Sequence, residues 1–158
     1  MKKLLLVVAA LAALVSVSAC GGSGARLTHQ EYEQEMQAIA RDMNARAGGM
    51  EMLATAPSQE SFVRLLRDLE ELVSAGADRV GAVNPPEEIA EPHETLADAL
   101  EEVADILDEA ADKAEDGDFF AVMGVLERAS DDLDADVRGA IRDIRTAGFY
   151  IGDEGDWG

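Results

Sequence analysis

The chain has 158 residues, with 33 acidic against 13 basic side chains and a formal net charge of −20. So acidic a surface argues against nucleic acid as a partner, because phosphate contacts need clustered lysine and arginine, and against lying flat on anionic lipid. A hydrophobic content of 47% is too high for a disordered acidic tail and suits one domain with its own core.

The first twenty residues carry the most specific motif. Two lysines precede an apolar run from Leu4 to Val15, which is too short for a membrane span of about 20 residues but typical of a signal peptide. The run leads into Val17-Ser18-Ala19-Cys20. An aliphatic residue, two small residues and a cysteine resemble the lipobox of bacterial lipoproteins.

This resemblance implies a lipid anchor. In that family a diacylglycerol is joined to the cysteine sulfur and the peptide is cut before the cysteine, so we expect cleavage between Ala19 and Cys20 and acyl chains such as palmitate on Cys20. The alternative is an ordinary secretory signal that contains a cysteine. The lone thiol of an exported chain would then need another explanation, because no second cysteine exists to pair with it.

Cleavage would leave 139 residues and, without the two leader lysines, take the net charge from −20 to −22. Residues 1–19 are the predicted signal peptide, and residues 20–27 the lipidated cysteine with a Gly/Ser-rich tether. We expect residues 28–150 to form one domain and residues 151–158 a short acidic tail.

Two helices are predicted in the first half of that domain. Thr28 and Glu31 have capping-box spacing, and the helix they begin is expected to run past Gly48-Gly49 to about Ala56, before Pro57. Its predicted core positions are Tyr32, Met36, Ile39 and Met43. Ser58 is a predicted N-cap for the second helix, which ends at Asn84-Pro85-Pro86 and carries one apolar stripe.

The third helix has the most regular pattern. With His93 at heptad position a, positions a and d are mostly aliphatic, and position e is alanine at Ala90, Ala97, Ala104 and Ala111. Pro92 is expected to split a short turn at 86–91 from the main helix or to kink it.

The fourth helix is expected to follow Asp116-Gly117-Asp118 and to end near Gly148. Its predicted buried face comprises Phe120, Met123, Leu126, Leu133, Val137, Ile141 and Ile144. Four amphipathic segments with short connections predict an all-α, up-down-up-down four-helix bundle.

The acidic residues allow two interpretations. They can form a solvated face that keeps the protein soluble, or a docking surface for a basic partner or for weakly bound divalent cations. Asp132, Asp134 and Asp136 have the opening spacing of an EF-hand loop, but Val137 occupies the position that needs glycine. A helical surface therefore fits these three residues better.

No reacting group of an enzyme is evident. The chain lacks nucleophile, phosphate-loop and dinucleotide motifs, and its methionines have the spacing of core residues, so we predict no enzyme, no catalytic or metal-binding residue and no cofactor. His93 lies near the Pro85-Pro86 corner. It is predicted to be either a hydrogen-bonded boundary residue or a ligand-binding or pH-responsive group.

The stretch from Asn84 to His93 also resembles small lipoproteins of high-GC Gram-positive bacteria, which carry a Pro-Pro pair, an acidic turn and a histidine before a long helix. This resemblance implies a helical domain and no known activity. We expect the chain to be held by Cys20 on the extracytoplasmic face of the cell membrane, or in the outer membrane if the host has one. Its expected role is to bind another envelope protein; the alternative is a bundle that binds a small ligand or divalent cations.

Overall fold

The computed structural model describes residues 25–50 and 58–152, without the side chains of residues 49, 50 and 128–134. Within these residues the chain forms four α-helices and one 3-10 helix and no strand, which confirms the predicted all-helical class. In chain order the elements are α2 (His29–Met50), α3 (Gln59–Gly81), η1 (Glu87–Ile89), α4 (Ala90–Glu115) and α5 (Phe119–Thr146).

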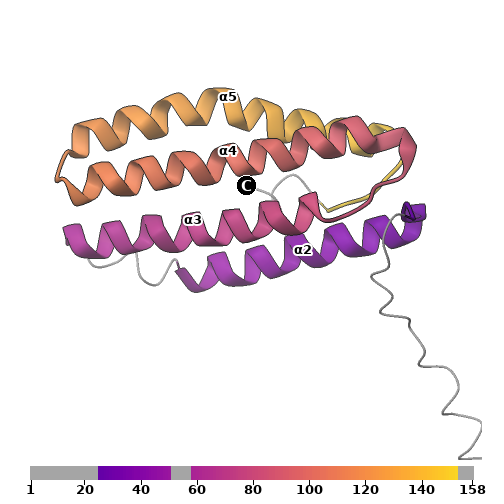
Figure 1. Ribbon diagram of the computed structural model, residues 1–158, viewed down its shortest axis with the longest axis horizontal. Coiled ribbons are helices and arrows are strands. Elements are labelled where there is room, and N and C mark those ends of the chain that lie inside the picture. Colours follow the sequence, from indigo (N-terminus) through magenta and orange to yellow (C-terminus); the bar gives the residue numbers. More distant parts are fainter. Residues whose placement is uncertain (1–24, 51–57, 153–158) are drawn as a thin grey trace, which may run out of the picture.

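The helices form a bundle in which each helix reverses the direction of the one before it (Figure 1). Helix α4 packs along both α3 and α5, and α2 packs on α3. The start of α2, the α3–α4 corner and the end of α5 therefore meet at what we call the N-terminal end of the bundle. The start of α3 and the α4–α5 turn lie at the opposite, far end (Figure 1).

Local capping chemistry sets the starts of the helices. The Thr28 backbone N–H and hydroxyl donate to the Glu31 carboxylate at 2.9 and 2.7 Å, as the predicted capping box requires. The Ser58 hydroxyl accepts from the Ser61 N–H at 3.1 Å, and the Asp118 carboxylate accepts from the Ala121 N–H at 3.0 Å. These three predicted starts are confirmed, whereas the predicted extension of α2 to Ala56 lies outside the described residues.

Two glycines end α4 and α5 in the same way. Gly117 and Gly148 have φ of 77° and 97°, in the left-handed region that a side chain disfavours. The Asp118 N–H then donates to the Lys113 carbonyl at 3.0 Å, and the Phe149 N–H to the Ile144 carbonyl at 3.2 Å. Both pairs are the long bond of a Schellman motif, which satisfies carbonyls that the helix leaves open.

A short helical turn precedes the third helix at the α3–α4 corner, as predicted, but the break falls two residues before the end of the predicted turn at 86–91. The 3-10 helix η1 ends at Ile89 and α4 begins at Ala90. Pro92 therefore lies in the first turn of α4, where the missing N–H costs no helical hydrogen bond.

The core has two parts. The cluster at the N-terminal end draws on all four α-helices and on the residues after α5; its members include Tyr32, Met36, Ile39, Val80, Ile89, Leu96, Leu100, Ile141, Ile144, Phe149 and Ile151. In the described part of the chain, the buried members of the far-end cluster come from α3, α4 and α5; they are Leu66, Ala110, Ala111, Ala114, Val122 and Val125. Three of its six buried members are alanines of α4, whose small side chains leave room for the neighbouring helices.

The prediction that Phe120 and Met123, near the start of α5, are buried is wrong. Met123 and Ile141 are 18 residues apart, which is five helical turns, so they lie on one face of α5. Ile141 is 1% exposed, yet Met123 is 64% exposed and Phe120 is 94% exposed. Among the residues that the structure describes, α2 contributes side chains to the core around Ile141 but none to the core at the far end.

The predicted boundary of the tail at residue 151 is also wrong. Ile151 is fully buried in the cluster at the N-terminal end, and Gly152 is buried beside it. A helical pattern could not reveal this contact, because residues 149–152 follow α5 in a non-helical conformation.

Helices α2 and α3 approach closely at Gly76. A Cβ atom at this position would lie 2.6 Å from the Met43 Sδ. We expect Gly76→Leu to lower the free energy of unfolding by about 1–3 kcal/mol through overpacking, measured by urea denaturation. Gly81→Leu on the same helix is the matched control, because nothing lies within 4 Å of a Cβ there. Equal stability of the two variants would contradict this packing.

Candidate functional site

The predicted cleavage and lipidation residues, Ala19 and Cys20, lie outside the described residues. The chain that follows them is nevertheless fixed in place where it enters the domain. The Leu27 N–H donates to the Asn84 carbonyl at 2.9 Å, and the Arg26 guanidinium donates to the Pro85 carbonyl at 3.1 Å. The segment before α2 is thus held to the α3–α4 corner, at the N-terminal end of the bundle.

His93 is buried at the same end, with 4% of its surface exposed. Its Nδ1 atom lies 3.1 Å from the Tyr32 hydroxyl, and its Nε2 atom lies 3.0 Å from the Val80 carbonyl. A carbonyl can only accept, so Nε2 carries the proton and Nδ1 accepts from Tyr32. Both nitrogens of the neutral ring are therefore satisfied, and His93 joins α2, α3 and α4.

Burial shifts both members of this pair toward their neutral forms. It lowers the pKa of His93, and the hydrogen bonds to the carbonyls of Val80 and Val83 oppose it only in part. Burial also raises the pKa of Tyr32. Glu91 and Glu94, which the sequence places beside His93, are exposed. The ring is instead faced by Tyr32, which was predicted only as a core residue.

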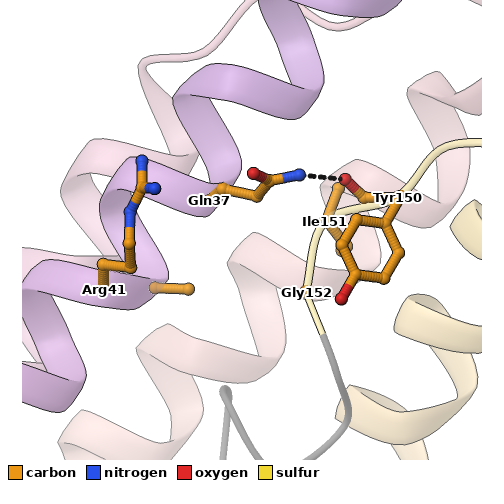
Figure 2. A pocket seen from close by; sticks show the side chains of 6 residues that line it. Gln37, Arg41, Tyr150, Ile151 and Gly152 are labelled. Atoms are coloured by element: carbon orange, nitrogen blue, oxygen red, sulfur yellow. Dashed lines mark hydrogen bonds between the residues drawn. The ribbon is translucent and has the colours of Figure 1, made fainter.

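Residues 149–151 form a strap that closes the N-terminal end. The Phe149 ring stacks on His29 with centroids 4.0 Å apart, and it meets the Tyr32 ring edge-on at 5.6 Å. The Tyr150 backbone is bound on both sides: its N–H donates to the Glu33 carboxylate, and its carbonyl accepts from the Gln37 side chain at 2.8 Å (Figure 2). The helical repeat of the sequence gives no signal for this strap, because residues 149–151 follow α5 in a non-helical conformation.

A small depression of about 150 Å³ lies between α2 and this strap. Figure 2 shows Gln37 and Arg41 on the α2 side and Tyr150 to Gly152 on the other. The Gln37 amide already donates to the Tyr150 carbonyl, which leaves Arg41 as the one charged group of the lining. The depression does not include His93, so the structure does not bring the predicted ligand-binding histidine to it.

Arg67 on α3 forms several ion pairs with the acidic surface of α4. Its guanidinium pairs with three carboxylates of α4, those of Asp108, Asp112 and Glu115. The hydrogen bonds to Asp112 and Glu115 raise the pKa of Arg67, so the group stays charged. One arginine thus cross-links α3 to α4 through carboxylates that would otherwise repel one another.

In the described part of the chain no three His, Cys, Asp or Glu side chains gather as a metal site would need. Helix α5 runs unbroken through residues 132–143, so the backbone of an EF-hand loop is not formed there. This confirms the helical interpretation of that segment.

At the far end, apolar side chains face outward. Phe119 is 46% exposed, beside the more exposed Phe120 and Met123. The Phe119 ring lies against Phe62 of α3, with centroids 6.0 Å apart. We call Phe119, Phe120 and Met123 the far-end patch.

Among the described helices none is both long and apolar enough to cross a membrane.

Comparisons with protein-family models, curated proteins and solved structures find no match to this chain.

Proposed function

We propose that the chain is an exported lipoprotein, held to the extracytoplasmic face of a membrane by a lipid on Cys20. The bundle is a non-enzymatic module that binds another protein of the envelope. The observation that carries this proposal is the complete lipobox, Val17-Ser18-Ala19-Cys20, at a position that leaves a short linker before a folded domain.

The attachment of the linker supports a defined orientation. Five residues separate Cys20 from Arg26, so the two lie at most ~22 Å apart, and Arg26 is bound to the α3–α4 corner. The 28 residues of α5 extend for about 42 Å toward the far end. In this proposal an up-down-up-down four-helix bundle stands with its N-terminal end near the headgroups and presents the far-end patch away from them.

Replacing Cys20 by alanine is the direct test of anchoring. We expect Cys20→Ala to abolish incorporation of labelled palmitate and to move the protein from the membrane to the soluble fraction, because no other acylation site is predicted. Fractionation and metabolic labelling in a bacterial host measure both effects.

The matched control moves the thiol instead of removing it. Cys20→Ala combined with Gln30→Cys keeps one cysteine in the chain, but the residue before it is His29 and not the small residue that a lipobox needs, so this variant is also expected to be released. Palmitate labelling of either variant would refute the anchor, whatever the bundle binds.

A further inference from the structure

The far-end patch is an unusual feature on so acidic a protein. Of the large apolar side chains that the structure describes, four are exposed, and three of these are Phe119, Phe120 and Met123. Phe120 and Met123 are neighbours on α5, three residues apart. Clustered exposed apolar side chains mark interaction sites more often than single ones do.

Acidic residues flank the patch along the chain. Residues 108–127, which run from the last turns of α4 through α5 past the patch, contain seven acidic residues and a single lysine. Asp116 and Asp118 directly precede the patch in the chain and both are exposed. Arg67, from α3, is already engaged by three of these carboxylates. The patch therefore belongs to a segment with an excess of negative charge, and we call the carboxylates of residues 108–127 its negative rim.

The negative charge near the patch favours some binding partners over others. A second copy of the chain would place two negative rims against each other, which costs free energy through like-charge repulsion. An anionic membrane surface would be repelled in the same way, and in the proposed orientation it lies at the opposite end. A positively charged partner meets neither penalty.

We propose that Phe119, Phe120 and Met123 form a docking site for a basic protein segment that carries apolar side chains among its lysines and arginines. This inference rests on the proposed function for the direction in which the patch faces. Phe120 and Met123 supply the apolar contact at the centre, and the carboxylates of the α4–α5 turn attract and orient the segment.

The test uses the chain from Gly21 to Gly158, because every member of both core clusters lies between residues 27 and 151. The probe is a fluorescent amphipathic peptide of leucine and lysine. A peptide with the same leucine pattern and glutamate in place of lysine tests the charge, and a lysine–glycine peptide tests charge without apolar contact.

We expect the leucine–lysine peptide to bind, and Phe120→Ser combined with Met123→Ser to weaken it by about tenfold or more, as loss of a central contact does. The same variant should leave binding of the lysine–glycine peptide unchanged. Tyr150→Ser is the matched control, because Tyr150 is a 49% exposed aromatic residue at the opposite end. Unchanged circular dichroism and melting temperature would show that each variant is folded.

Three results would overturn the inference. The first is equal binding of the leucine–glutamate peptide, which would leave the rim without a role. The second is equal binding of the leucine–lysine peptide to the double variant, which would place binding elsewhere on the acidic surface. The third is a dimer in light scattering that the double variant converts to a monomer, since a second copy would then occupy the patch. None of these bears on Cys20, whose anchoring is tested separately.

Discussion

Truncation of the chain after Gly148 is expected to lower the melting temperature by at least ~15 °C, or to leave the domain unfolded. The truncation removes Phe149 and Ile151, which are 1% and 0% exposed. Replacing a buried phenylalanine by alanine costs about 3–5 kcal/mol and a buried isoleucine about 2–5 kcal/mol. Their combined loss is comparable to the whole stability of a domain, about 5–15 kcal/mol. Thermal unfolding followed by circular dichroism measures the effect.

Truncation after Gly152 is the matched control, because it keeps both buried side chains and the backbone bonds of Tyr150 to Glu33 and Gln37. Phe149→Ala and Ile151→Ala in the full chain separate the two contributions. If the two truncated proteins melt at the same temperature, residues 149–151 are not part of the core and the strap does not exist in solution.

The helix boundaries could be predicted because they depend on neighbours in the sequence. Each of these boundaries is set by a hydrogen bond to a backbone group that spans at most five residues. The bonds involve Thr28 with Glu31, Ser58, Asp118 and the turn at Gly148. Such bonds form in the same way whatever packs outside the helix. The heptad pattern of α4 was similarly reliable, because its a, d and e positions face the interior of the bundle along the whole helix, in one or the other of the two core clusters.

The exposure of Phe120 and the burial of Ile151 could not be predicted from local pattern. Phe120 and Met123 have the spacing of a buried face, and whether that face is covered depends on which elements pack against each part of α5. Ile151 depends on a chain reversal at Gly148 that returns it to α2. Both are properties of tertiary packing, which overrides a pattern read along one segment.

The prediction for His93 was partly correct, because the helical repeat determines its burial but not its hydrogen-bond partner. The heptad placed His93 on a buried seam, which the structure confirms. Its hydrogen-bond partner Tyr32 is 61 residues away in the chain, so nothing in the spacing could pair them. Glu91 and Glu94, which lie close to His93 in the sequence, are exposed because they fall on the outer face of α4.

The His93–Tyr32 pair leads to a prediction about acid stability. Burial lowers the pKa of His93 in the folded state below its unfolded value of about 6.5. Below that pH the unfolded chain binds a proton that the folded chain resists. The stabilising contribution of neutral His93 is therefore complete above about pH 6.5, and it is lost as the pH falls from there through the folded-state pKa.

Comparison with His93→Gln isolates this effect, because His29 and all carboxylates are present in both proteins. We expect the free energy of unfolding of the wild type, measured in urea from pH 8 to pH 5.5, to fall relative to that of His93→Gln as the pH decreases. Parallel curves would mean that His93 titrates alike in both states and that its burial has no electrostatic consequence.

The partner variant Tyr32→Phe tests the hydrogen bond itself. It keeps the ring and its contact with Phe149 but removes the hydroxyl that donates to His93 Nδ1. Leaving a buried acceptor unpaired costs about 1–3 kcal/mol, so we expect a lower free energy of unfolding at pH 8, measured in urea.

A double-mutant cycle with His93→Gln separates the hydrogen bond from the packing of the two rings. We expect the two substitutions to be coupled, because the imidazole nitrogen that Tyr32→Phe leaves unpaired is absent once His93 is replaced. Additive losses would mean that the 3.1 Å contact between the Tyr32 hydroxyl and His93 Nδ1 does not contribute to holding α2 against α4.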